Sequence, residues 1–234
     1  MAKYLIVNAD DFGLARGVNE GIIKAHKEGL VTSTSLMVDS LYTSEAVKSA
    51  KSCPNLSLGL HFTASNEHAQ NLYDIKNIEL TKKELTRQYN LFFNLVGKKP
   101  THIDSHQHFH TNENLLPIFV AFSKEHNIPL RHSSHIIYTG EFHGKWYGWD
   151  EKKQILLGYP LHDLISTQNL RRILGDLSEG IAELGCHPGY FAKELEGTYN
   201  KEREIELATL TDPSLKLLIK ELNIRLINFA EIPK

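Results

Sequence analysis

The chain has 234 residues, of which 41% are hydrophobic and 23% charged, with a formal net charge of −2 and only two cysteines. These values are typical of a globular protein with a sizeable core, and they argue against a disulfide-stapled fold and a basic nucleic-acid-binding surface. The N-terminal stretch has no signal-peptide pattern and no apolar run approaches membrane-spanning length. We therefore expect a cytoplasmic protein with no nucleic-acid or membrane partner.

Strand-like and helix-like segments alternate along the chain. Apolar runs predict strands at 3–9, 33–38, 56–62, 101–106, 128–132, 180–189 and 224–232. Helical periodicity predicts helices at 18–29, 44–52, 81–97, 114–127, 168–179 and 212–223. Thr81, followed by Glu84 three residues later, forms a capping-box pattern and is the expected N-cap of the third helix. Residues 136–165 are rich in aromatic residues and show no clear periodicity.

The repeated strand-then-helix order predicts an α/β fold. Seven or eight mostly parallel strands surrounded by helices favour a (β/α) barrel-like architecture over an open doubly wound sheet in a chain of this length. We find no linker, low-complexity tract or internal repeat, so residues 1–234 are predicted to form a single domain.

Ionisable side chains gather where the predicted strands end. In either parallel architecture, the carboxyl ends of the strands meet at one rim, and active sites lie there. A single histidine or aspartate at such a place is usually structural, but groups from five strands at one rim favour a functional site. The residues concerned are Asp10, Asp11, His61, Asp104, His106, Arg131, His132 and His187.

The run THIDSHQHFH at 101–110 has an ionisable residue at every second position from 102. In a strand, these side chains would share one face. The rise of about 3.3 Å per residue nevertheless separates positions i and i+4 by about 13 Å, and a metal–nitrogen bond is only about 2 Å long. One ion can therefore bind at most an i,i+2 pair. We expect the strand to end near Asp104 and His110 to lie in a loop rather than bind metal.

Four motifs resemble those of the YdjC family of carbohydrate deacetylases, which includes the enzyme that deacetylates chitooligosaccharides. They occur in order along nearly the whole chain. The motifs are NADDFG at 8–13, GLHF at 59–62, HIDSHQHFH at 102–110 and CHPGY at 186–190. The resemblance implies a (β/α)-barrel-like fold, one divalent metal ion, and a hydrolase that removes N-acetyl groups from sugars.

Carried over residue by residue, the resemblance implies that Asp11, His61 and His106 bind the metal, with His108 as the alternative to His106. Asp10 would be the catalytic base, by analogy with polysaccharide deacetylases that also use adjacent aspartates. We expect magnesium, with zinc, manganese and cobalt as alternatives, because a mixed histidine and carboxylate set accepts all four ions.

The chemistry of amide hydrolysis suits these residue types. The reaction needs a polarised carbonyl, an activated water and a protonated leaving amine. His187 is the candidate general acid, and its alternative role is purely structural. Asp104 is expected to accept the second N–H of a ligand histidine, and Arg131 to steady Asp10 or the substrate. His108 is expected to orient a ligand or line the substrate site.

Five aromatic residues are expected in loops after the predicted strands, where they would either stack on a sugar or pack over the barrel and against another subunit. They are Trp146, Tyr147, Trp149, Tyr159 and Tyr190. A homodimer is the expected assembly, although the sequence has no coiled-coil pattern or obviously apolar helix face that would indicate an interface.

Three other functions remain open. Two histidines and a carboxylate also bind Fe(II) in oxygenases, but those have a different fold and the strand–helix alternation opposes it. A (β/α)-barrel phosphoesterase would use two or three metals, with His102, His108 and Asp104 as further ligands. A non-catalytic metal-binding or sugar-binding homologue would not need Asp10.

Overall fold

The computed structural model describes residues 2–132, 136–153, 155–196 and 198–232. Its strands are β1 (Lys3–Phe12), β2 (Ser33–Leu36), β3 (Ser57–Phe62), β4 (Ile103–Ser105), β5 (Ile136–Thr139), β6 (Lys145–Asp150), β7 (Ile155–Pro160), β8 (Gly180–Cys186) and β9 (Ile224–Leu226). The α-helices are α1 (Arg16–Glu28), α2 (Thr43–Ala50), α3 (Ile78–Val96), α4 (Leu116–His126), α5 (Thr167–Gly175), α6 (Lys201–Leu210) and α7 (Pro213–Glu221). A short 3-10 helix, η1 (His106–Thr111), directly follows β4.

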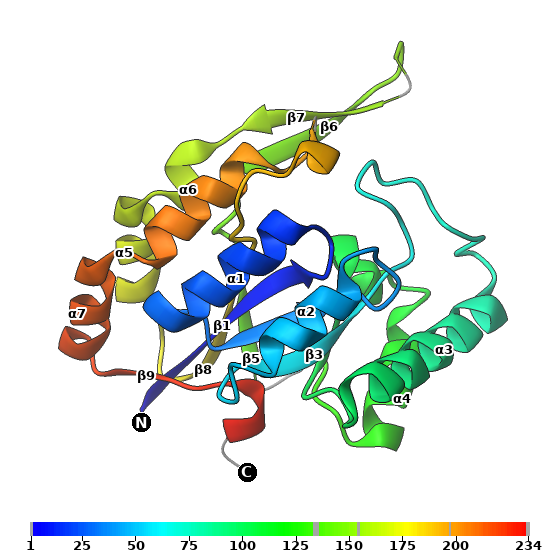
Figure 1. Cartoon of the computed structure of the whole chain (residues 1–234), viewed down its shortest axis with the longest axis horizontal. Coiled ribbons are helices and arrows are strands. Elements are labelled where there is room, and N and C mark those ends of the chain that lie inside the picture. Colours follow the sequence, from blue (N-terminus) through cyan, green and yellow to red (C-terminus); the bar gives the residue numbers. More distant parts are fainter. Residues whose placement is uncertain (1, 133–135, 154, 197, 233–234) are drawn as a thin grey trace.

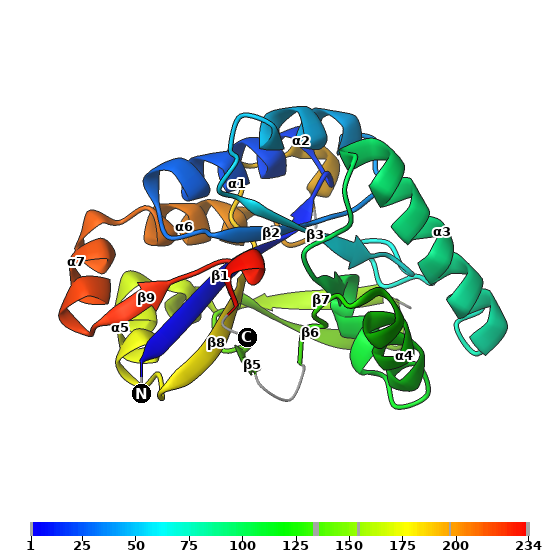
Figure 2. The same cartoon turned by 90° about the horizontal axis from the view of Figure 1, so that it is seen from below.

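Seven parallel strands form one curled sheet with the order β4-β3-β2-β1-β8-β5, and β9 also pairs with β1. The helices follow one another around the outside of this sheet (Figure 2). The expected (β/α)-barrel-like fold with mostly parallel strands is therefore confirmed. Strands β6 and β7 form a separate antiparallel hairpin that projects from one side of the molecule (Figure 1).

The packing of the core explains why the strands appear in the sequence as continuous apolar runs. Both faces of β1 and β3 are buried, with the sheet interior on one side and helices on the other. The carboxyl ends of β1, β3, β4 and β8 lie at a common edge, which brings the motifs after these strands together. Among the described residues, no helix combines the length and the hydrophobicity needed to cross a membrane.

The structure corrects four expectations about local structure. The segment 128–132 is not a strand: Leu130 makes only an isolated bridge to β4, and His132 has a left-handed backbone with a φ of 61°. Helix α3 begins earlier than expected, because Asn77 caps it by accepting a hydrogen bond from the Leu80 N–H at 3.1 Å. Thr81 is instead buried inside the helix.

The other two corrections concern elements in the second half of the chain. The aromatic residues expected in loops at 146, 147, 149 and 159 lie on the β6–β7 hairpin, whereas Tyr190 does lie in a loop. Helix α6 was not expected at all. Its polar residues Glu202, Arg203 and Glu206 are buried, so the apolar face that normally identifies a helix in a sequence is interrupted.

Candidate metal and catalytic site

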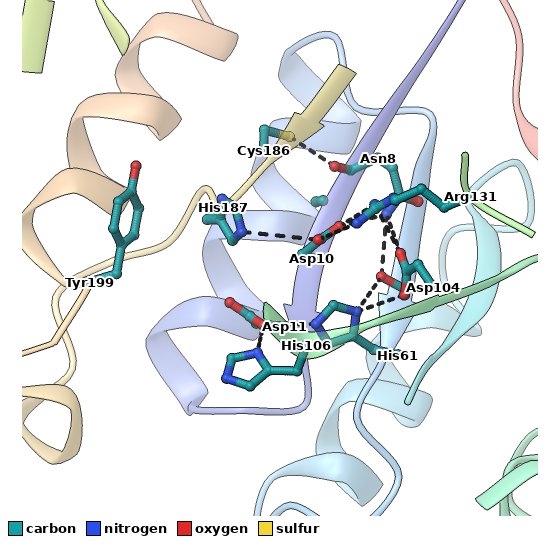
Figure 3. Close-up of polar contacts among 12 residues, drawn as sticks. Asn8, Asp10, Asp11, His61, Asp104, His106, Arg131, Cys186, His187 and Tyr199 are labelled. Carbon is teal, nitrogen blue, oxygen red and sulfur yellow. Dashed lines mark hydrogen bonds and ion pairs between the residues drawn. The ribbon is translucent and has the colours of Figure 1, made fainter. Parts of the chain in front are cut away.

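A cavity of about 470 Å³ lies at the carboxyl ends of the parallel strands. This volume is in the range of small-molecule sites and is large enough for a sugar unit. Its walls combine ionisable and aromatic side chains from six separate parts of the chain, several of which Figure 3 shows pointing toward one another. The lining includes Asp10, Asp11, His61, Glu67, His106, His108, Tyr138, His143, Tyr147, His187, Tyr199 and Arg203.

A break in the strand pattern brings the adjacent carboxylates of Asp10 and Asp11 into this cavity. Neighbours in a regular strand point to opposite faces of the sheet. Between Ala9 and Phe12, however, the register with β2 shifts, and Asp11 has a left-handed φ of 66°. Such an irregularity re-aims a side chain. Both carboxylates can therefore serve the same site.

Asp11, His61 and His106 form a compact set of metal-ligand groups. One ligand atom from each lies within 4.8 Å of the others. Asp11 Oδ1 is 3.2 Å from His61 Nε2 and 3.1 Å from His106 Nδ1. His61 Nε2 is buried and has no hydrogen bond among the described residues, as expected for a nitrogen that binds metal. One carboxylate and two imidazoles make a donor set that fits a divalent cation.

Carboxylates lie at the outer nitrogens of both histidines. Asp104 Oδ1 is 2.7 Å from His61 Nδ1, because His61 and Asp104 are paired positions on the neighbouring strands β3 and β4. Glu67 Oε1 is 3.0 Å from His106 Nε2. A carboxylate at this place fixes the tautomer and the ring orientation of a metal-binding histidine. Asp104 was expected here from the sequence, whereas Glu67 was missed.

The electrostatic potential at this cluster favours a cation. Burial opposes the charge on His61, but the carboxylates of Asp104, Asp11 and Asp10 outweigh it and raise the pKa of His61 to about 10. Burial likewise opposes the charge on His106, but Asp11 and Glu67 raise its pKa to about 9. The negative potential that holds protons on these imidazoles would equally attract a divalent ion, which replaces those protons.

Arg131 is completely buried and links three carboxylates. Figure 3 shows it beside two of them, Asp10 and Asp104. Its guanidinium donates two hydrogen bonds to Asp10, at 2.6 and 2.7 Å, and one to Glu183 at 2.7 Å. It also lies 2.9 Å from Asp104 Oδ2. Burial would raise the pKa of Asp10, but Arg131 outweighs it and lowers that pKa below the ordinary value. The Asp10 carboxylate is therefore ionised at neutral pH and held in one orientation.

Arg203 is a site residue that the sequence did not point to. It lies on α6, is completely buried, and donates a hydrogen bond to Asp11 Oδ2 at 2.7 Å. Burial opposes ionisation of Asp11, but Arg203, with His106 and His61, lowers its pKa well below the ordinary value. Arg203 thus occupies one oxygen of Asp11 and leaves the other to face the two histidines. The sequence gives no clear signal for this role, because charged residues interrupt the apolar face of α6.

His187 lines the same cavity and comes from the segment directly after β8. Its Nε2 is 4.0 Å from Asp10 Oδ2, and its Nδ1 is 3.8 Å from Glu206 Oε1. Burial lowers the pKa of His187 to about 3, so the ring is neutral at neutral pH. Behind it, Glu206 accepts hydrogen bonds from the backbone N–H of His187 and from the Tyr199 hydroxyl. Burial raises the pKa of Glu206 to about 8.

Glu206→Gln is expected to change the pH dependence of stability. Between the ordinary carboxyl pKa of 4.5 and about 8, folded Glu206 keeps its proton while the unfolded chain loses it. The free energy of unfolding of the unmutated protein therefore falls with rising pH, by up to about 1.4 kcal/mol per pH unit. Glutamine does not titrate, so the variant should gain relative stability in urea unfolding between about pH 5 and pH 8.

The exposed Glu221→Gln substitution on α7 is the matched control and should show no such trend relative to the unmutated chain. A relative loss of stability by Glu206→Gln as the pH rises would mean that Glu206 is ionised and stabilised in the folded protein.

The histidines of the 102–110 run have separate environments. Strand β4 ends at Ser105, as expected near Asp104, and the chain continues into η1. His102 stacks on Phe229, with ring centroids 3.8 Å apart, so it is part of the packed interior. His110 is buried, not loop-exposed, with its Nδ1 2.7 Å from Ser105 Oγ. His108 lines the cavity, and its ring contacts those of His110, His132 and Tyr138.

The aromatic residues divide between the two faces of the hairpin. Tyr147 lines the cavity, and Leu156 from β7 lies beside it in the lining. Trp146 is 58% exposed on the other face, where its ring packs on Tyr159 at 5.5 Å. Trp149 is 56% exposed and pairs across the hairpin with Leu156. The hairpin therefore contributes Tyr147 to the cavity wall and presents a second aromatic surface outside it.

Comparison with known proteins gives a consistent picture. The family model described as YdjC-like protein matches residues 4–221. A carbohydrate deacetylase of Thermoanaerobacter pseudethanolicus is 32% identical, with 97% of this chain and 98% of that protein aligned. A chitooligosaccharide deacetylase of Yersinia enterocolitica is also 32% identical, over 99% of this chain and 100% of that protein.

Solved structures show the same fold. A crystal structure described as a putative cellobiose-phosphate cleavage protein from Enterococcus faecalis is 29% identical, with a TM-score of 0.77 and 98% of each chain covered. A family 4 carbohydrate esterase from Streptomyces lividans, in complex with acetate, has a TM-score of 0.55 at 12% identity, covering 95% of this chain and 91% of the other. The second similarity concerns the fold alone.

Proposed function

This chain belongs to the YdjC-like protein family, and from that premise we propose that it is a carbohydrate deacetylase. It hydrolyses the N-acetyl groups of acetylated sugars such as chitooligosaccharides. The observation that carries the proposal is the pair Asp10 and Asp11 at one bulge. Arg131 holds Asp10 ionised, while Asp11 faces His61 and His106. The relatives named carbohydrate and chitooligosaccharide deacetylases support it.

Asp11, His61 and His106 would hold one divalent ion. When bound, such an ion polarises the acetyl carbonyl and lowers the pKa of water beside it. Magnesium is the ion that we propose, with zinc, manganese and cobalt as alternatives for the same donor set. Asp104, Glu67 and Arg203 keep the ligand side chains oriented. The homodimer, the cytoplasmic location and the single domain over residues 1–234 stay predictions of the sequence.

Asp10 is the proposed general base. In the reaction, the water oxygen bonds to the acetyl carbon, the carbon–nitrogen bond breaks, and the proton of the water passes to the Asp10 carboxylate. Two hydrogen bonds from Arg131 and a third from the Asn8 amide, at 2.8 Å, leave Asp10 with little freedom to rotate. Fixed orientation of a base removes an entropic part of the barrier.

His187 is the proposed general acid for the leaving nitrogen. Because the resting ring is neutral, the proton that it delivers has to be acquired during the cycle. Asp10 Oδ2 lies 4.0 Å from His187 Nε2, so the proton taken from water can pass from Asp10 to His187 and then to the amine. Glu206 accepts a hydrogen bond from the backbone N–H of His187 and so helps to hold this residue in place.

Removal of divalent ions is expected to abolish acetate release. Metal-stripped protein would be incubated with N,N′-diacetylchitobiose and related acetylated oligosaccharides, before and after addition of magnesium, zinc, manganese or cobalt. We expect acetate release to return with a divalent ion. The amide is inert without catalysis, and the ion would both polarise its carbonyl and lower the pKa of the attacking water. Release of phosphate from sugar phosphates, without acetate from any substrate, would contradict the proposal and show that the protein is a phosphoesterase.

A further inference from the structure

A second group of imidazoles lies beside the catalytic cavity and takes no part in the mechanism above. His108 and His110 come from η1, and His132 comes from the segment that follows α4. One ligand atom of each residue lies within 4.8 Å of the other two. The ring centroids are 6.1 Å apart for His108 and His110, 5.8 Å for His108 and His132, and 5.5 Å for His110 and His132.

His110 supplies an independent sign that this group binds a ligand. Its side chain is completely buried, and its Nε2 has no hydrogen-bond partner within residues 2–132, 136–153, 155–196 and 198–232. Its other nitrogen, Nδ1, is 2.7 Å from Ser105 Oγ. When Nδ1–H donates to Ser105, the lone pair of Nε2 is free, which is the arrangement of metal-binding histidines. A buried nitrogen of this kind is costly unless something binds it.

Two of the three rings, those of His110 and His132, are in the neutral state that binds metal. Burial, and then the positive charge of Arg131, lowers the pKa of His110 to about 3 and also lowers that of His132. Both imidazoles are therefore neutral at neutral pH. Arg131 does not exclude a cation from the cluster, because its own charge is matched by the carboxylates of Asp10, Asp104 and Glu183.

We propose that His108, His110 and His132 form a second metal site, separate from Asp11, His61 and His106. Three imidazoles without a carboxylate suit zinc, cobalt or nickel and do not suit magnesium, which prefers oxygen ligands. His108 and His132 are exposed, so an ion can reach the site from solvent and keep one position open to it. The site goes beyond the deacetylase activity and does not depend on it.

A bound ion would add a link between η1 and the 128–132 segment, which already contacts β4 through the ion pair of Arg131 with Asp104. Around the cluster, the only strand-type contact of the 128–132 segment within the described chain is the bridge from Leu130 to Ile103. Tyr138 of β5 packs on His108 and His132, with ring centroids 5.5 and 4.5 Å away. Since Tyr138 and His108 also line the catalytic cavity, the ion would brace one wall of the substrate site.

The test counts ions on the full chain. Metal-stripped protein is titrated with cobalt alone, and bound cobalt is measured by elemental analysis and by its visible absorption, which reports nitrogen-rich coordination. The unmutated chain should bind two cobalt ions. His132→Ala and Asp11→Asn should each bind one, and the two variants should keep different absorption spectra. His162→Ala changes an exposed histidine that lies next to Glu202, away from both clusters, and this variant should bind two.

Thermal unfolding without metal checks that His132→Ala folds as the unmutated chain does, and cobalt should raise its midpoint less. A His132→Ala chain that binds the same number of cobalt ions with the same spectrum would overturn the proposal. So would an unmutated chain whose single cobalt ion is lost in Asp11→Asn. Neither result bears on acetate release, so failure of this site and failure of the deacetylase proposal are distinguishable.

Discussion

Asp10→Asn is expected to lower the turnover number for acetate release by ~10²–10⁴-fold, the usual contribution of a general base. The amide has nearly the shape of the carboxylate but cannot take a proton from water. Arg131 keeps its contacts with Asp104 and Glu183 in the variant, so the fold should survive. The measurement is acetate release from N,N′-diacetylchitobiose at saturating magnesium, together with the magnesium concentration for half-maximal activity.

The matched control is Asp163→Asn, the same chemical change at an exposed position, which should leave turnover unchanged. The half-maximal magnesium concentration of Asp10→Asn should stay within a few-fold of the unmutated value. A large increase in that concentration would show that Asp10 binds the ion, and the assignments of Asp10 and Asp11 would then be exchanged.

His106→Ala is expected to raise the half-maximal magnesium concentration by at least 10- to 100-fold. Loss of a group that only orients a ligand typically weakens metal binding by about 10–100-fold, and removal of the ligand itself should cost at least as much. His106 Nδ1 is 3.1 Å from Asp11 Oδ1, so its deletion removes one of the three proposed donor atoms. Magnesium titration of acetate release measures the effect.

His108→Ala decides between the two histidines that the sequence left open. Its ring contacts His110, His132 and Tyr138, so its removal should leave the half-maximal magnesium concentration within a few-fold, whatever it does to turnover. Magnesium is the right ion here, because the three-histidine cluster should not bind it. If His108→Ala weakens magnesium binding and His106→Ala does not, the ligand lies two residues further along the chain.

The two adjacent aspartates show which part of the site the local sequence predicts and which part it does not. The motif NADDFG after an apolar run was enough to place Asp10 and Asp11 at the end of a buried strand. The roles proposed for them, base and metal ligand, need both side chains on one side of the sheet, and a regular strand forbids that. The shift in register and the left-handed φ of Asp11 provide it. An aspartate with a left-handed backbone is uncommon, and the sequence pattern does not predict one at this position.

Partners contributed by distant segments were the least predictable part of the site. Arg203 and Asp11 are 192 residues apart in the sequence, and their contact depends on α6. This helix was not predicted, because its buried charged residues interrupt the apolar pattern of a helix. Glu67 lies in an irregular stretch between β3 and α3, where no periodicity assigns a side chain to a face. Arg131 was noticed because it follows an apolar run, although that run is not a strand in the structure.

The sequence by itself determined the alternation of strands and helices, the family resemblance, and the gathering of Asp10, Asp11, His61 and His106 at one rim. These features are local, because strand and helix periodicities and motif spacing involve neighbours along the chain. Only the tertiary structure decided which charged groups pair: Arg131 with three carboxylates, Arg203 with Asp11, and Glu206 behind His187. It also decided that His108, His110 and His132 meet. Pairing and burial depend on how separate segments pack, and they set the pKa of each group.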